Sequence, residues 1–342
     1  MRSAITELRD LKMPVEQPLP KAKHGLRALP WDSEQKPLML APLQGLTNRA
    51  TRSLFIDWVR PDVVFTEFMR VSSVGRKHLS KNDLKEAVST TGGVPLVAQL
   101  VGNNSQALVK AAEHAEAAGA LHINLNMGCP YGRTASGASG GAMLQYPEIL
   151  AEMLPALRQA ISGTFSIKLR AGYKDPGEIF ALLPLITDAD VDFLVIHPRT
   201  VTQKYAGSAD HRITGRVVRE LSIPVIANGD IRTAEQGLRI LEETGAAGLM
   251  LGRGAIADPL LFERLRKQHT EEPTEAETAA MLHRYLKELL RLYSDLFCGE
   301  RQILDKVKNV LSFIDTPAFS KRITKMKRVH NLADLSALIE AL

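Results

Sequence analysis

The chain has 342 residues, of which 45% are hydrophobic and 24% are charged, a composition close to that of an average soluble globular protein. At roughly 150 residues per domain, this length predicts one large domain and a smaller one, and the composition excludes a disordered or fibrous protein. The net charge of +5 is only mildly basic, so the distribution of charge along the chain says more about a polyanionic partner than the total does.

Residues 1–36 mix charges and prolines and lack the apolar stretch of a secretory signal. We therefore predict an irregular N-terminal leader over 1–36. No apolar run reaches the ~18 residues that a membrane span needs. Cys129 and Cys298 stand too far apart for a CxxC metal pair and give no disulfide framework. Together these features predict a cytoplasmic protein with neither a membrane span nor a metal site.

Over residues 37–265, short apolar runs alternate with stretches long enough to hold a helix. Eight of these runs are predicted to be strands: 38–41, 63–66, 96–100, 122–126, 165–169, 193–197, 224–228 and 248–251. Near-continuous apolar runs are typical of strands buried on both faces. The regular alternation predicts an α/β fold of the (β/α)8 TIM barrel type over 37–265. A doubly wound open sheet is the alternative, but it would more often carry GxGxxG after its first strand.

Beyond Leu260 the strand pattern stops, and helices are predicted over 275–296, 301–314 and from 333 to the end. Residues 266–342 are therefore predicted to form an all-helical C-terminal domain. Between Arg301 and His330, eight Lys or Arg residues oppose two Asp residues, a local charge of +6. Because this excess is larger than the net charge of the whole chain, it favours a surface that binds a polyanion over an ordinary solvated helix face.

Polar residues lie at the C-terminal ends of the predicted strands, where such barrels carry their active sites. Lys168 lies in the fifth strand, His197 ends the sixth and Gln99 lies in the third. Glycine-containing segments follow the seventh and eighth strands, namely Asn228-Gly229-Asp230 and Gly252-Arg253-Gly254. Loops at these positions frequently bind phosphate through backbone N–H groups, and an arginine adds forked donors. We predict a phosphate site here; the alternative is two tight turns with a surface arginine.

The fourth predicted strand runs into Asn126-Met127-Gly128-Cys129-Pro130. A thiol with an ordinary pKa of roughly 8.5 is mostly protonated at neutral pH, so Cys129 could donate a proton or act as a nucleophile. A lone cysteine can also be a small buried apolar residue. Lys168 could form a Schiff base or stabilise negative charge on a bound ring. His197 could contact a ligand, carry a proton or simply end its strand.

Taken together, these motifs closely resemble the tRNA-dihydrouridine synthases, flavoenzymes that reduce uridine in tRNA to dihydrouridine. The resemblance runs from about Leu38 to Arg264 and is strongest over 123–130, which is close to the family's signature around its active-site cysteine. Seven further segments support it in the right order on the predicted strands: 41–47, 66–67, 98–100, 167–172, 197–200, 228–231 and 251–255.

The resemblance implies FMN in the barrel mouth and NADPH as the electron source. The residues that it implies around FMN are Pro42, Leu43 and Gln44 beside the ring, Gln99 and Lys168 at its polar edge, His197 nearby, and Asn228, Gly229, Asp230, Gly252 and Arg253 around the ribityl chain and phosphate. Lys168 would then stabilise negative charge on the reduced flavin, while Cys129 protonates the uracil. Cys129, Lys168 and His197 are the expected catalytic residues, and Asn126 and Arg170 are expected contacts of uracil or flavin.

The resemblance also implies that the helical domain binds tRNA, with Lys321, Lys325 and Lys327 against its phosphates. The loop 136–142 and the segment 306–311 resemble the bacterial C-type enzyme, which acts on a D-loop uridine. Position 16 is therefore the expected target, and we expect a monomer. Departures from the family pattern, such as Pro198 where glycine is common, leave the loop geometry and the choice of uridine open.

Two other functions are compatible with part of the sequence. An FMN barrel oxidoreductase acting on a free pyrimidine would share the barrel residues but would not need the basic C-terminal region. A non-catalytic RNA-binding barrel protein would use the basic region but would leave Cys129 and Lys168 unexplained.

Overall fold

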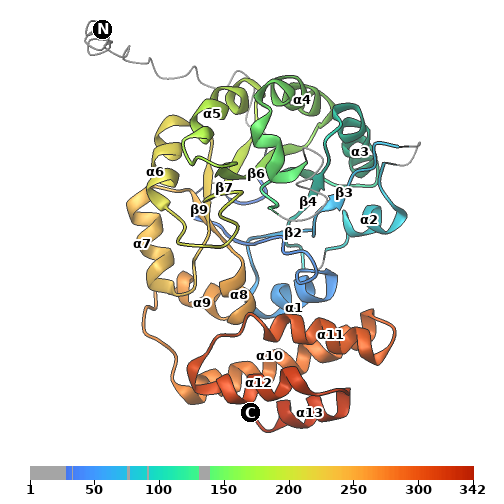
Figure 1. Cartoon of the computed structure of the whole chain (residues 1–342), viewed down its shortest axis with the longest axis vertical. Helices are drawn as coiled ribbons and strands as arrows, with labels where there is room; N and C mark the ends of the chain where they lie inside the picture. Colours follow the sequence, from blue (N-terminus) through green and yellow to red (C-terminus); the bar gives the residue numbers. More distant parts are fainter. Residues whose placement is uncertain (1–27, 33, 75–77, 91, 131–138) are drawn as a thin grey trace, which may run out of the picture.

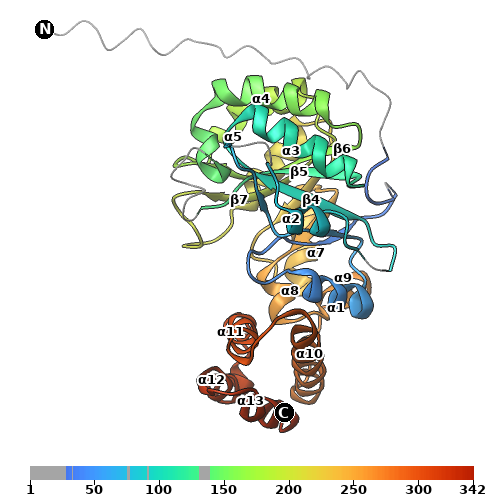
Figure 2. The same ribbon diagram turned by 90° about the vertical axis from the view of Figure 1, so that its right-hand side faces the viewer.

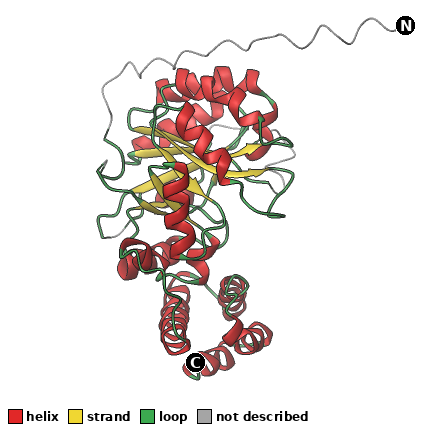
Figure 3. Ribbon diagram, turned by 90° about the vertical axis from the view of Figure 1, so that its left-hand side faces the viewer, coloured by secondary structure: helices red, strands yellow, loops and turns green. Residues whose placement is uncertain are grey.

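The computed structural model describes residues 28–32, 34–74, 78–90, 92–130 and 139–342 (Figure 1). Most of the predicted leader, 1–27, and part of the predicted loop 136–142 lie outside the described residues. The described chain forms a barrel with a group of helices at one end (Figure 2). All strands lie in the first part, and the C-terminal part contains helices without strands (Figure 3).

The barrel is a closed parallel sheet. Its strands are β1 (Leu38–Leu40), β2 (Val63–Phe65), β3 (Met69–Arg70), β4 (Leu96–Val101), β5 (His122–Met127), β6 (Thr164–Gly172), β7 (Phe193–Thr200), β8 (Val225–Asn228) and β9 (Gly248–Leu251). β1 pairs with both β2 and β9, and a pairing between β2 and β4 completes the ring. The predicted (β/α)8 barrel is confirmed, and each of the eight predicted strands is present.

One barrel strand is interrupted, which the sequence did not indicate. β2 pairs with β4 at Phe65 opposite Val97, and β3 pairs with the same strand further on, at Met69 opposite Leu100. β2 and β3 are therefore two segments of one barrel position, separated by 66–68. Because Phe68 lies in this interruption, its side chain can reach the barrel mouth.

Helices cover the outside of the barrel (Figure 1). They are α1 (Arg49–Val59), α2 (Lys81–Glu86), α3 (Ser105–Ala117), α4 (Pro147–Ala160), α5 (Glu178–Asp188), α6 (His211–Glu220), α7 (Ala234–Thr244), α8 (Arg253–Ala257) and α9 (Leu261–Arg266). A 3₁₀ helix, η2 (Gly140–Gln145), precedes α4. Local sequence sets several helix ends. Thr233 and Gln236 form a capping box at the start of α7, and Gly245 ends this helix in the left-handed conformation.

Apolar side chains fill the barrel interior and close its N-terminal end. Met39, Phe65, Phe193 and Met250 belong to this buried core. The ring of Trp31 lies edge-on to Phe193 with 4.9 Å between the ring centroids. The described end of the predicted leader is thus without helix or strand, yet it packs against the barrel.

The C-terminal helices are α10 (Glu275–Leu296), α11 (Glu300–Leu311), α12 (Ser320–Arg328) and α13 (Leu332–Glu340), with the 3₁₀ helix η3 (Pro317–Phe319) before α12. α10 packs against α1, where the Tyr293 hydroxyl lies 2.8 Å from Oγ1 of Thr51. Helices had been predicted for α10, α11 and α13, whereas α12 had not. None of the helices within the described ranges combines the length and apolar composition needed to cross a membrane.

Candidate active site

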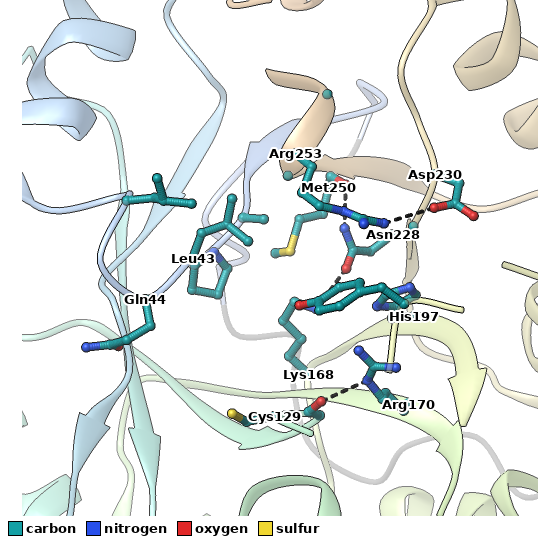
Figure 4. Close-up of a pocket in the computed structure, with 18 of the residues that line it drawn as sticks. Leu43, Gln44, Cys129, Lys168, Arg170, His197, Asn228, Asp230, Met250 and Arg253 are labelled. Atoms are coloured by element: carbon teal, nitrogen blue, oxygen red, sulfur yellow. Dashed lines mark hydrogen bonds and ion pairs between the residues drawn. The ribbon is translucent and has the colours of Figure 1, made fainter. Parts of the chain in front are cut away.

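A cavity of about 510 Å³ opens at the C-terminal ends of the barrel strands (Figure 4). Side chains that are far apart in the sequence converge on it, because the loops after parallel strands all emerge at the same end. The structure places thirteen of the predicted site residues in its lining: Pro42, Leu43, Gln44, Asn126, Cys129, Lys168, Arg170, His197, Asn228, Gly229, Asp230, Gly252 and Arg253.

Gln99 was predicted at the cofactor but does not line this cavity. Its side chain is fully buried in the barrel, behind Asn126. Gln99 Nε2 donates to Asn124 Oδ1 at 2.8 Å, and its Oε1 accepts from Asn126 Nδ2 at 2.8 Å. Asn124 in turn donates to the hydroxyl of Ser166 at 2.8 Å. Gln99 is therefore placed to orient Asn126 through a buried polar chain.

Asn126 holds the turn that carries Cys129. Its Oδ1 accepts hydrogen bonds from the backbone N–H groups of Gly128 and Cys129, both at 3.0 Å. On the other side of the turn, the N–H of Gly141 donates to the Cys129 carbonyl at 3.2 Å. These bonds fix the backbone on which the thiol is carried, so Cys129 is presented to the cavity from a supported turn.

Lys168 projects from β6 toward the opposite wall (Figure 4). Its Nζ donates to Asn228 Oδ1 at 2.8 Å, and Asn228 Nδ2 donates to the Met250 carbonyl at 2.8 Å. Burial, together with the positive charge of Arg170, lowers the pKa of Lys168 to about 7. The amine is thus only partly charged near neutral pH, and a bound anion would favour its charged form.

Arg170 is buried at the cavity wall and ties two loops together. Its Nε donates to the Gly128 carbonyl at 2.9 Å, while its Nη1 donates to the carbonyls of Thr200 and Lys204 at 2.9 and 2.6 Å. Arg170, which was predicted to contact the ligand, therefore also stabilises the loops after β5 and β7.

Asp230 lines the cavity, but its carboxylate binds the neighbouring arginines. Oδ1 accepts from Arg199 and Arg253 at 2.9 and 3.1 Å, and Oδ2 accepts from Arg199 and from the N–H of Ala209 at 2.6 and 2.8 Å. With about four acceptor positions on a carboxylate, Asp230 is fully engaged. Two guanidinium groups against one carboxylate leave one net positive charge, which suits a phosphate group.

Gly229 is required by the packing beside this cationic group. Its φ of +121° is a conformation that side-chain-bearing residues rarely adopt. A Cβ atom here would lie 2.7 Å from Cδ2 of His197. The glycine thus lets the loop after β8 approach the histidine ring.

His197 is buried and surrounded by positive charge. Burial, followed by the charges of Lys168, Arg170, Arg199 and Arg253, lowers the pKa of His197 well below its usual value. The imidazole is therefore neutral at neutral pH.

Besides Phe68, two aromatic residues that the sequence analysis missed, Tyr205 and Phe313, also line the cavity. The Tyr205 ring centroid lies 4.4 Å from the Arg253 guanidinium carbon and 5.3 Å from that of Arg170. Tyr205 is the single aromatic residue in 201–210, and this feature of the loop after the sixth predicted strand could have suggested a role at the site. Phe313 follows α11 and reaches the lining from the C-terminal helices. Nothing local in the sequence connects Phe313 with the barrel mouth.

The predicted RNA contacts lie outside the cavity. Lys321, Lys325 and Lys327 are exposed on α12, whereas Ile323 and Met326 on the same helix are buried. The amphipathic pattern of α12 therefore turns these lysines toward solvent. Within the described ranges, no group of three or more His, Cys, Asp or Glu residues is arranged to hold a metal ion.

The chain is similar to a known protein family over most of its length. A family model described as dihydrouridine synthase matches residues 39–340. The chain is 32% identical over 240 residues to the tRNA-dihydrouridine(16) synthase of Vibrio parahaemolyticus, covering 68% of this chain and 74% of that protein. It is 31% identical over 295 residues to the protein of the same name from Haemophilus influenzae, with 79% and 94% covered.

Other similarities bear on subgroup and fold. The chain is 32% identical over 252 residues to the tRNA-dihydrouridine synthase B of Vibrio parahaemolyticus, covering 72% of this chain and 77% of that protein. Among solved structures, morphinone reductase aligns with a TM-score of 0.51 and 14% identity, covering 71% of this chain and 88% of that chain. The structural likeness supports the barrel fold alone.

Proposed function

Since the chain belongs to the dihydrouridine synthase family, we propose that it uses FMN and NADPH to reduce the C5–C6 double bond of a D-loop uridine in tRNA. Position 16 is the favoured target, because it stands in the names of the Vibrio and Haemophilus relatives. The observation that carries the proposal is that Cys129, Lys168 and the cationic group around Arg253 meet in one cavity.

The lining fits the cofactor that we propose. Its volume of about 510 Å³ lies within the usual range for small-molecule sites. Arg253 and the backbone of Gly229 and Gly252 offer donors and positive charge to a phosphate, while Leu43 and Met250 offer apolar surface to a ring system. Lys168 would lie at the polar edge of that ring and favour negative charge on it.

Bound FMN, once reduced by NADPH, would supply the electron pair that reduces one carbon of the uracil double bond. Cys129 would donate the proton to the neighbouring carbon, which requires the neutral thiol. Asn126 would hold the turn that presents this thiol, since its Oδ1 accepts from the N–H of Cys129. General-acid help of this kind contributes roughly 10²- to 10⁴-fold to a rate.

The substrate must bring its base into the cavity. A uridine in folded RNA is stacked, so it has to be turned out of its stack before Cys129 can reach it. Lys321, Lys325 and Lys327 on α12 would bind phosphates of the tRNA body. Phe313 lines the cavity from the same helical domain, which gives that domain a place at the target nucleotide as well.

The test is reconstitution with defined RNA. Purified protein is loaded with FMN and given NADPH and an unmodified tRNA transcript, and dihydrouridine is located by mass spectrometry. We expect one modified D-loop position, and no product when uridine 16 is replaced by cytidine. Product that persists in this transcript would reject position 16. Reduction of free uracil or uridine without reduction of tRNA would favour a small-molecule oxidoreductase, and failure to bind FMN would favour a non-catalytic RNA-binding protein.

A further inference from the structure

The guanidinium group of Arg199, on β7, has all five of its N–H donors engaged. Nε donates to the Ala206 carbonyl at 3.2 Å. Nη1 donates to Asp230 Oδ1 at 2.9 Å and lies 3.1 Å from Nε2 of His197. Nη2 donates to the Gly207 carbonyl and to Asp230 Oδ2, both at 2.6 Å. The side chain is only 2% exposed, so its donors are satisfied by groups of the protein rather than by solvent.

This geometry decides where His197 carries its proton. A guanidinium group is always a donor and has no acceptor atom. The contact between Arg199 Nη1 and His197 Nε2 therefore requires Nε2 to accept, and an accepting ring nitrogen bears no hydrogen. A neutral imidazole has one N–H, which must then be at Nδ1.

Packing keeps the ring in this orientation. A Cβ atom on Gly229 would lie 2.7 Å from Cδ2 and 3.0 Å from Nε2 of His197, so this edge of the ring lies against the loop after β8. The Nδ1 atom lies on the other side of the ring. In the part of the chain that the structure describes, no hydrogen bond involves Nδ1, although His197 lines the cavity.

The charged and titratable groups that face His197 come from every neighbouring element. Lys168 and Arg170 lie on β6, Arg199 on β7, Arg253 on α8, and Asp230 in the loop after β8. His211 lies behind this loop, where its Nε2 is 2.9 Å from the Gly229 carbonyl, and the Tyr205 ring lies 6.4 Å away. Asp230, the carboxylate in this group, is already engaged by two arginines, so among the described residues named here none compensates an imidazolium charge.

We propose that Arg199 fixes His197 as the neutral Nδ1–H tautomer, which makes this histidine a permanent hydrogen-bond donor to the cavity and excludes it as a proton shuttle. Arg199 is a positioning residue, because it acts through His197. The tautomer is a property of the chain itself. The further consequence, that Nδ1–H donates to an acceptor atom of bound FMN, rests on the proposed function.

The direct test measures the tautomer in the wild-type protein. ¹⁵N-histidine is incorporated, His197 is assigned by comparison with His197→Gln, and long-range ¹H–¹⁵N spectra are recorded from about pH 5 to about pH 9. We expect a protonated Nδ1, an unprotonated Nε2 and no titration across this range. A proton on Nε2, or a ring that becomes charged within the range, would overturn the proposal whatever the variants do.

Variants then assign the effect to Arg199. Arg199→Met removes the donor, and we expect a mixture of the two tautomers in the same ¹H–¹⁵N spectra. Arg199→Lys restores a charged donor and should recover the Nδ1–H tautomer. The control is Arg212→Met, which removes an exposed arginine that is paired with Asp210 at 2.7 Å and should leave His197 unchanged.

The outcomes also separate this inference from the proposed function. An unchanged tautomer in folded Arg199→Met would assign the tautomer to packing and overturn the role of Arg199. If this variant does not fold, the wild-type spectra still decide, because a proton on Nε2 would overturn the proposal. The expected tautomer in a protein that binds no FMN would reject the proposed function and leave the inference intact. An active FMN enzyme with the proton of His197 on Nε2 would support the proposed function and reject the inference.

Discussion

Lys168 and Asn228 join β6 to β8 across the barrel mouth through a hydrogen bond of 2.8 Å from Nζ to Oδ1. Asn228 is itself held by the Met250 carbonyl on β9, so the lysine is aimed by three strands at once. This placement favours the electrostatic role for Lys168 over Schiff-base chemistry, because the amine is held as a donor.

We predict that FMN affinity falls as the pH rises above about 7. The pKa of Lys168 is lowered to about 7 without a ligand, and a bound anion raises it again, so above pH 7 binding must take up a proton. The dissociation constant should rise by up to about tenfold per pH unit. Fluorescence titrations at several pH values measure it, and Lys168→Met should bind weakly with no such slope. A slope that persists in Lys168→Met would assign the proton to another group.

Cys129→Ala should keep bound flavin and NADPH oxidation but lose dihydrouridine formation by about 10²- to 10⁴-fold, because only the proton donor is removed. Stopped-flow oxidation of NADPH and product analysis by mass spectrometry measure the two steps separately. Cys298→Ala is the matched control, since Cys298 is exposed and does not line the active-site cavity. Wild-type product yield in Cys129→Ala would contradict the proposed donor.

Asn126→Leu should slow dihydrouridine formation while flavin remains bound. The change leaves the N–H groups of Gly128 and Cys129 without their acceptor, at a cost of about 1–3 kcal/mol, so the turn that carries the thiol loosens. Asn126→Asp keeps the acceptor and should retain more activity. The alkylation rate of Cys129, measured in a Cys298→Ala background, reports directly on the turn. If Asn126→Leu and the parent with Asn126 are alkylated at the same rate, Asn126 does not hold the turn.

Gly229→Ala should reduce both stability and FMN binding. The new Cβ would meet His197 at 2.7 Å in a backbone conformation with φ of +121°, and strain of this kind costs roughly 1–3 kcal/mol. Denaturant unfolding of the cofactor-free protein gives the value. Gly93→Ala separates the two causes, because Gly93 has φ of +69° but nothing within 4 Å of its Cβ position. If the free energy of unfolding falls equally in the two variants, the contact with His197 does not contribute to the loss.

Replacing Lys321, Lys325 and Lys327 by Gln should weaken tRNA binding and flatten its salt dependence by up to about three units of log–log slope, one for each phosphate contact. Filter binding over a range of salt concentrations measures the slope, and flavin content should not change. The control replaces Lys36, Lys110 and Lys267, which are exposed and lie outside α12. An unchanged slope in the first variant would remove α12 from the RNA-binding surface.

The sequence predicted the barrel because its evidence is local. A buried parallel strand is a short apolar run, and every predicted run from 38–41 to 248–251 became a strand. The same reasoning located the strand ends, so Cys129, Lys168 and Arg253 could be assigned to one mouth before their contacts were known. The short helix α12 was missed because its buried face consists of two residues, Ile323 and Met326, which is too few to give a periodic pattern.

Only the tertiary structure decided how these side chains are used. Gln99 lies behind Asn126 and Asp230 is engaged by two arginines, although both residues sit at strand positions that typically face a ligand. Phe313 enters the cavity from the C-terminal helices, and Nη1 of Arg199 lies 3.1 Å from Nε2 of His197. A residue's type and its place on a strand can be predicted from the neighbouring sequence. Its hydrogen-bond partner is set by register and packing between segments that lie far apart in it.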